Sequence, residues 1–161
     1  MSQTDSKKSG ESAPRGNISR ARSQARRCVM QALYQWQLTE QSYAEILAQF
    51  IERDEYQTAN AEYFAELLNG AITHHEVLAG RVVEFADRPW VQLDPIERAI
   101  LLLGMYELLH RVDVPYRVIV NEAVELTKQF GATDGYKYIN ALLDRAARAI
   151  RAAECAQRSS R

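Results

Sequence analysis

Residues 94–109 constrain the fold more than any other part of the chain. Asp94 is a good helix-capping residue, Pro95 suits a first helical turn, and Glu97 stands three positions after the cap, as in a capping box. The residues that follow, 99–109, are apolar on nearly every side of a helix. Such a helix must be covered by other elements all round, so the segment predicts a central, mostly buried helix.

Further helices are predicted around it, because apolar residues recur at spacings of three and four and no stretch shows sustained strand alternation. The expected helices cover about 18–38, 43–53, 59–86 and 94–109, then the segment from Pro115 to Phe130, and the segment from Thr133 or Asp134 to Ile150. Gly70 and Gly80 each weaken the third helix by roughly 1 kcal/mol relative to alanine, so we expect a kink or split there. Gly131 is expected to close the fifth helix in a left-handed conformation.

At 161 residues and 47% apolar, the chain has enough material for one sizeable core. We expect a single all-α domain of six to seven helices over residues 18–153. Residues 1–17 lack large apolar side chains and predict a disordered tail, and residues 154–161 predict a flexible one. The sequence has no apolar run near the roughly 18 residues of a membrane span and no secretory signal, which favours a cytoplasmic protein.

Catalytic chemistry is not indicated. Cys28 and Cys155 are far apart, so neither a disulfide framework nor a thiolate metal site is expected. His74 and His75 are neighbours and point about 100° apart on a helix, which disfavours joint metal binding. The chain has no glycine-rich dinucleotide motif and no Walker-type loop. We therefore predict no enzyme activity, no cofactor and no metal.

Charge is segregated along the chain although the formal net charge is only -1. Residues 1–27 carry seven basic side chains against two acidic ones, and residues 144–161 carry five against two, which leaves the middle acidic. This distribution predicts a polyanionic partner at one surface and a basic partner at another. The C-terminal arginines are expected on the outer face of the last helix.

The first predicted helix has an apolar and a basic side. Its inner face is expected to hold Ala25, Val29, Leu33 and Trp36. The opposite polar stripe is expected to hold Arg20, Gln24, Arg27, Gln31 and Gln35, with Arg22 and Arg26 flanking it. Arginine forks match phosphate geometry and stay charged, so the stripe predicts nucleic-acid binding, and the alternative is an ordinary solvated helix face.

A second basic segment covers residues 134–140, DGYKYIN. It sets Lys137 between Tyr136 and Tyr138 in the opening turns of a helix, whose free N–H groups favour phosphate. Exposed tyrosines stack on unpaired bases, whereas the alternative is that at least one of the two packs into the bundle. The pattern favours single-stranded RNA over duplex DNA.

Several segments of the chain form a specific pattern. They are ARRCVMQALYQWQL at 25–38, ERAIL at 97–101, DVPYRVIVNEAVEL at 113–126, and Phe130-Gly131 followed by Asp134, Lys137, Asn140, Leu143 and Asp144. Together these segments resemble the NusB family of bacterial transcription antitermination factors. The resemblance runs from about 20 to 150 and implies an all-helical fold of two packed bundles without catalysis. It also implies binding of the boxA element of nascent ribosomal RNA together with NusE, a small-subunit ribosomal protein. That complex would promote read-through by RNA polymerase and ribosomal RNA synthesis.

The resemblance also implies residue roles. It gives RNA contacts to Arg22, Arg26, Gln31, Lys137 and Tyr138. With Arg20 and Arg27 of the polar stripe, these make up the predicted RNA-binding set. The partner-binding set is Tyr34, Leu38, Glu97 and Asp134, where acidic residues suit a basic ribosomal protein. The chain departs from the family pattern at Ser23 and Gln24, which interrupt the basic row, at Gly135, where serine is common, and at Tyr138, where phenylalanine is usual.

Three alternatives stay open on the sequence. One is a helical module that binds protein but not RNA. Another is the NusB-like domain of a ribosomal RNA methyltransferase, which would need a further cofactor-binding domain. The third concerns assembly, because the surface around Tyr34 and Leu38 also suits a homodimer when NusE is absent.

Overall fold

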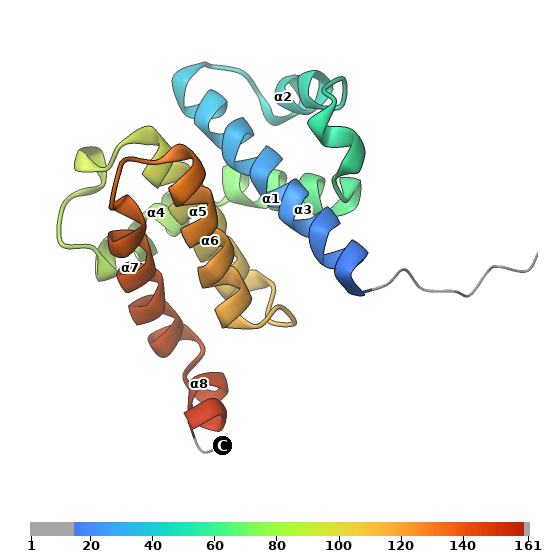
Figure 1. The fold of residues 1–161 in the computed structure, drawn as a ribbon. Helices are drawn as coiled ribbons and strands as arrows, with labels where there is room; N and C mark the ends of the chain where they lie inside the picture. Colours follow the sequence, from blue (N-terminus) through green and yellow to red (C-terminus); the bar gives the residue numbers. More distant parts are fainter. Residues whose placement is uncertain (1–14, 160–161) are drawn as a thin grey trace, which may run out of the picture.

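The computed structural model describes residues 15–159, and α-helices make up most of them (Figure 1). In chain order the helices are α1 Arg15–Leu38, α2 Tyr43–Phe50, α3 Ala61–Thr73, α4 His75–Phe85, α5 Pro95–His110, α6 Tyr116–Phe130, α7 Gly135–Ile150 and α8 Ala152–Ser159. Two short 3-10 helices, η1 Glu55–Thr58 and η2 Trp90–Gln92, lie in the connections. Residues 15–159 contain no strand, which confirms the all-α prediction.

The central helix is α5, as predicted. All its residues from Ala99 to Leu108 are buried, and it packs against α1, α3, α4, α6 and α7. The predicted capping box starts it: the Glu97 N–H donates to Asp94 Oδ1 at 2.8 Å, and the Asp94 N–H donates to Glu97 Oε1 at 3.2 Å. Because α5 is apolar nearly all round, it buries side chains against the helices on every side of it.

The helices around α5 form two groups, visible in Figure 1. On one side, α1, α2 and α3 pack on one another. On the other, α4 and α6 pack on α7, which α8 continues. One continuous apolar core extends through both groups, so the molecule has the two packed bundles that the family resemblance implied.

The third predicted helix is divided into α3 and α4, but at a different place from the expected one. The break falls at His74, whose φ of -105° and ψ of 20° leave the helical region, and both Gly70 and Gly80 lie inside helices. Gly70 serves close packing instead, since a Cβ there would be 2.2 Å from Cε2 of Tyr106 on α5. The glycine therefore allows α3 to approach the central helix.

Gly131 follows α6, but the prediction of a left-handed conformation there is wrong. Its φ of -92° and ψ of -177° are extended, and a Cβ would be 2.9 Å from the Thr127 carbonyl oxygen, so glycine is needed for space. The left-handed residue is Asp134, with φ of 67°, immediately before α7. Aspartate is one of the few non-glycine residues that enter this region readily.

A flexible tail was expected over residues 154–161, but the described part of it belongs to α8, Ala152–Ser159. Arg151 precedes α8 and is buried, which corrects the expectation that the C-terminal arginines all lie on the outer face. Its guanidinium donates to the carbonyl oxygens of Glu107, Leu108 and Arg111 at 3.0, 2.9 and 2.9 Å. Carbonyls at a helix end lack intrahelical partners, so Arg151 caps the end of α5.

At the other end, residues 15–17 already belong to α1, and residues 1–14 of the predicted tail lie outside the described residues, as do 160 and 161. Among the helices that the structure describes, none combines the length and apolar character needed to cross a membrane.

We predict that Gly70→Ala and Gly80→Ala change the free energy of unfolding in opposite directions. Space around Gly80 is open, so alanine should stabilise α4 by roughly 0.5–1 kcal/mol. At Gly70 the new methyl group would meet the Tyr106 ring, with an expected loss of about 1–3 kcal/mol. Urea denaturation of both variants measures this, and a Gly70→Ala protein as stable as the parent would contradict the close approach of α3 to α5.

Candidate nucleic-acid interface

Arg26, in the middle of the basic row, lies inside the protein. Its side chain is 3% exposed and that of Glu107 on α5 is 1% exposed. Arg26 Nε donates to Glu107 Oε1 at 2.9 Å, and Nη2 donates to Oε2 at 2.9 Å. The hydroxyl of Tyr63 on α3 donates to the same carboxylate. The cluster therefore ties α1, α3 and α5 together.

The protonation of this cluster follows from its surroundings. Burial alone would lower the pKa of Arg26, but the hydrogen bonds and charge of Glu107 outweigh it, so the pKa lies above its ordinary value. Burial and the Glu107 carboxylate also raise the pKa of Tyr63. Both groups stay protonated and donate to Glu107. This corrects the expectation that Arg26 flanks an exposed polar face, because its guanidinium is closed off from a phosphate.

Two other basic residues of α1, Arg20 and Arg27, lie along one side of that helix. Arg20 is exposed, and it lines a polar hollow of about 350 Å³ between α1 and α6 together with the half-buried Arg27. The Arg27 guanidinium lies over the ring of Phe130, 5.2 Å from its centroid. Gln31 follows one turn later and lines the next hollow. We define the α1 track as Arg20, Arg27, Gln31, Tyr34 and Leu38.

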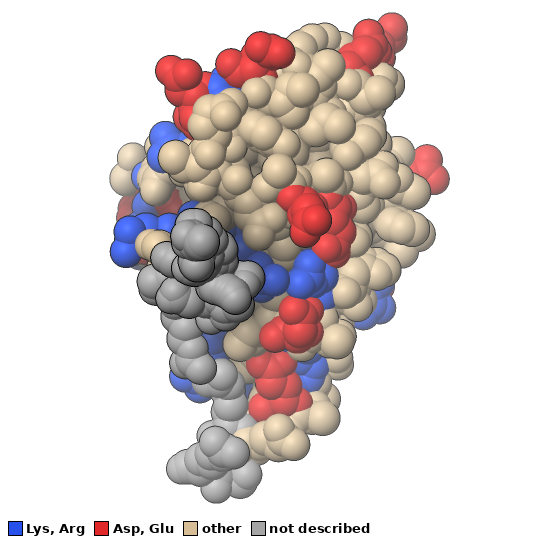
Figure 2. All heavy atoms as spheres, turned by 90° about the vertical axis from the view of Figure 1, so that its right-hand side faces the viewer, with Lys and Arg blue, Asp and Glu red and all other residues tan. Residues whose placement is uncertain are grey.

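Charge on this side of the molecule is uneven. Figure 2 shows basic side chains gathered around the point where the described chain begins, at the start of α1, and acidic side chains scattered over the rest of the same face. On this face, basic side chains therefore lie near the start of α1, with acidic side chains both beside them and farther away.

Arg22 lies to one side of the α1 track. Its guanidinium covers the Tyr63 ring at 4.5 Å from the centroid. It also lines a small hollow of about 220 Å³ with Asp113 and Val118. Arg22 is half-buried, so it offers less of its guanidinium to a ligand than Arg20 does.

The two residues that interrupt the basic row make internal contacts. The Ser23 hydroxyl donates to the carboxylate of Glu122 on α6. Gln24 Nε2 donates to the Glu55 carbonyl oxygen of η1 at 3.1 Å. The interruption therefore anchors α1 to its neighbours instead of extending a row of free charges.

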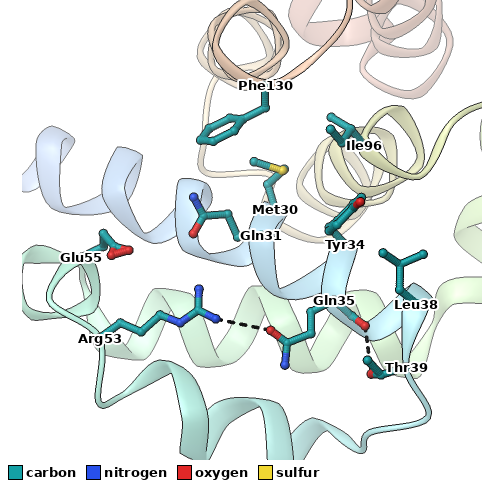
Figure 3. Close-up of a pocket in the computed structure, with 10 residues that line it drawn as sticks. All are labelled: Met30, Gln31, Tyr34, Gln35, Leu38, Thr39, Arg53, Glu55, Ile96 and Phe130. Atoms are coloured by element: carbon teal, nitrogen blue, oxygen red, sulfur yellow. Dashed lines mark hydrogen bonds between the residues drawn. The ribbon is translucent and has the colours of Figure 1, made fainter.

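The C-terminal part of the track forms one wall of a groove of about 690 Å³ (Figure 3). Tyr34 and Leu38 stand on this wall and are 38% and 57% exposed. Phe130 from the end of α6 and Ile96 from the start of α5 face α1 across the groove. The remaining lining residues are Met30, Gln31, Gln35, Thr39, Arg53 and Glu55. The groove is thus an exposed apolar surface directly continuous with the basic end of α1.

The two acidic candidates lie near the ends of other helices. Glu97 is half-buried, and one of its carboxylate oxygens is already used in the capping box of α5, next to the groove residue Ile96. Asp134 is exposed, and its carboxylate lies 3.7 Å from the Lys137 ammonium.

On α7, Lys137 is exposed whereas Tyr138 is half-buried and packs against the core. The Arg88 guanidinium lies over the Tyr138 ring, 4.3 Å from its centroid. Tyr136 is also half-buried, with the Lys128 ammonium 5.0 Å from its ring centroid. The structure thus supports the alternative that at least one of these tyrosines packs into the bundle.

Sequence reasoning missed Phe130 as a groove residue and Arg88 as the neighbour of Tyr138. Phe130 had a local signal, because it directly precedes Gly131 at the end of a helix. Arg88 had none, since its contact with α7 depends on how the chain folds back between α4 and α5.

The described part of the chain contains neither a metal-binding cluster nor an activated Cys28 thiol. No group of three or more His, Cys, Asp or Glu side chains is placed there to hold a metal ion. Burial raises the pKa of the Cys28 thiol to about 11, which suits a core residue and not a reactive one.

Comparison with known proteins gives consistent matches. The model of the NusB family matches residues 23–148. The transcription antitermination protein NusB of Alcanivorax borkumensis is 45% identical over 141 residues, covering 88% of this chain and 94% of the relative. That of Burkholderia vietnamiensis is 48% identical over 134 residues, covering 83% and 92%.

Two solved structures share the fold. NusB of T. maritima matches with a TM-score of 0.71 at 24% identity, covering 86% of this chain and 93% of that one. A crystal structure of the antitermination factors NusB and NusE in complex with dsRNA matches with a TM-score of 0.70 at 24% identity, covering 81% and 98%.

Arg26→Ala should destabilise the protein by about 3–5 kcal/mol, because it leaves Glu107 buried without its cationic partner. The triple variant Arg26→Met, Tyr63→Phe, Glu107→Leu replaces the three buried polar side chains and should recover most of that loss. Urea denaturation compares both with Arg20→Ala, an exposed arginine on the same helix. A loss in Arg26→Ala no larger than that in Arg20→Ala would show that the buried pair does not hold α1.

Proposed function

Because this chain belongs to the NusB family of transcription antitermination proteins, we propose that it binds the boxA element of nascent ribosomal RNA together with NusE. The assembly then helps RNA polymerase read through terminators and supports ribosomal RNA synthesis in the cytoplasm. The protein acts as a binding factor and not as an enzyme. One observation carries the proposal: a single helix, α1, presents arginines at one end and an exposed apolar groove wall at the other.

The RNA-binding part of the proposal uses the basic end of the α1 track. Arg20 and Arg27 bind phosphates, and the Gln31 amide hydrogen-bonds a base edge. Arg22 contributes from the side, while Arg26 holds α1 in place from within the core. Lys137 and Tyr138 bind a further stretch of the RNA. The solved structure of NusB and NusE in complex with dsRNA, which shares this fold, supports RNA binding as the role of the domain.

The NusE-binding part uses the groove. Tyr34 and Leu38 are large, exposed and adjacent on one wall, as expected of apolar anchors in a protein interface. Glu97 and Asp134 add negative charge at helix starts nearby, which suits a basic ribosomal protein. The same apolar surface would serve a homodimer when NusE is absent, so sedimentation of the isolated protein over a range of concentrations belongs with the binding experiments.

Arg20→Ala and Arg27→Ala should each weaken RNA binding and flatten its salt dependence by roughly 0.7–1 unit of log-log slope, because each removes one phosphate contact. Fluorescence anisotropy of labelled boxA RNA, and of a scrambled RNA, measures this with and without NusE. Arg148→Ala is the matched control, an exposed arginine near the end of α7. Equal affinity of wild type and both α1 variants would exclude the basic end of the track as the RNA surface.

Tyr34→Ala and Leu38→Ala should abolish the tightening of RNA binding by NusE and leave binding of RNA alone unchanged, because both side chains lie in the groove beyond the arginines. Calorimetric titration of NusE into each variant provides the direct affinity. Val77→Ala, at an exposed valine of α4, is the control. Wild-type NusE affinity in both groove variants would contradict the assignment, and NusE binding without any RNA effect would favour a purely protein-binding module.

A further inference from the structure

Tyr138 does not offer a free ring face on the side where Arg88 lies. The Arg88 guanidinium is 4.3 Å from the ring centroid, and the rest of the half-buried tyrosine packs against the core. A base that stacked directly on this side of the tyrosine would have to displace the arginine. The group that a ligand meets first here is therefore Arg88.

Neighbouring groups hold the Arg88 guanidinium in one plane. Its Nε donates to Asp87 Oδ1 at 2.8 Å, and its Nη2 donates to Asp87 Oδ2 at 3.4 Å. This pairing also keeps the pKa of the Asp87 carboxyl below its usual range. The backbone beside it is fixed on α7, because Arg145 Nη2 donates to the Phe85 carbonyl oxygen at 2.6 Å.

The side chain of Arg88 is nevertheless 37% exposed. The guanidinium carbon lies over the tyrosine ring, two of its nitrogens donate to Asp87, and the exposed part is available to a ligand. Guanidinium planes stack on nucleobases, and a platform already oriented by its neighbours loses little conformational freedom when a base settles on it.

We propose that Arg88, supported by Tyr138, is the stacking platform for an unpaired base of the bound RNA, with Lys137 binding an adjacent phosphate. The inference rests on the proposed function and adds a residue and a mode of contact to it. Lys137 can bind a phosphate because it is exposed and its ammonium lies 3.7 Å from an equally exposed Asp134 carboxylate. Such a surface pair is weak enough to exchange for a phosphate.

A stacking platform differs from a phosphate ligand in two measurable ways. Asp87 already balances the charge of Arg88, so replacing Arg88 should lower the salt dependence of RNA binding by less than the full unit of log-log slope expected for a lost phosphate contact. Lysine keeps the charge but has no plane to stack on. Arg88→Lys should therefore bind RNA roughly tenfold more weakly than wild type, as weakly as Arg88→Ala, which is within the range of one lost base stack.

The experiment is an anisotropy titration of labelled boxA RNA with NusE present, repeated at several salt concentrations, with circular dichroism to verify each fold. Arg81 on α4 provides the matched control, since its side chain is 35% exposed and lies 3.3 Å from the Glu84 carboxylate. Arg81→Ala and Arg81→Lys should bind like wild type. Tyr138→Phe should also bind like wild type, because the ring that supports the guanidinium remains.

Wild-type affinity in Arg88→Lys would overturn the proposal, whether or not Arg88→Ala is weakened, because charge alone would then suffice. A salt slope lowered by a full unit in Arg88→Ala and restored in Arg88→Lys would make Arg88 a phosphate ligand and would equally contradict stacking. Failure of the proposed function has a different signature: wild type, Arg20→Ala and Arg27→Ala would all show the same weak, unselective binding, which would overturn both proposals together.

Discussion

The ion pair between Arg26 and Glu107 is the interaction on which the rest of the structure depends. It joins α1 to the central helix α5, and Tyr63 brings α3 into the same cluster. A buried pair of this kind adds little net stability over apolar residues of similar size, but either partner left alone is strongly destabilising. We infer that the pair acts mainly on specificity, because only one rotation of α1 about its axis brings Arg26 to Glu107.

That rotation determines what the surface of α1 can do. With Arg26 inside, the exposed Arg20 and the half-buried Arg27 lie beside α6, and Tyr34 and Leu38 fall on the wall of the groove. One rigid helix therefore presents a phosphate-binding end and an apolar protein-binding end in a fixed relation. RNA and a protein partner that bind these two ends would lie side by side, which is how a single small domain can join them.

Local signals predicted the fold well. The capping box of Asp94 and the all-round apolar run of α5 specified the central helix, because both act within a few residues. Local signals do not predict contacts between residues far apart in the sequence. The partner of Arg26 lies 81 residues away, and helical periodicity placed this arginine only at the edge of a polar stripe. Glu107, an acidic residue inside the apolar run, was the available clue, since a buried carboxylate requires a partner. No local sequence feature predicts the extended conformation of Gly131 or the position of Arg88 over the Tyr138 ring, because both depend on tertiary packing.

The arginines of α1 divide into a buried structural residue, Arg26, and two proposed RNA ligands at the surface, the exposed Arg20 and the half-buried Arg27. NMR spectra of the arginine Nε–H groups, recorded as boxA RNA is titrated in, test it most directly. We expect the Arg20 and Arg27 signals to shift with RNA, whereas the Arg26 signal is protected from hydrogen exchange beforehand and stays in place. An Arg26 signal that exchanges quickly with solvent and shifts as far as that of Arg20 would contradict it.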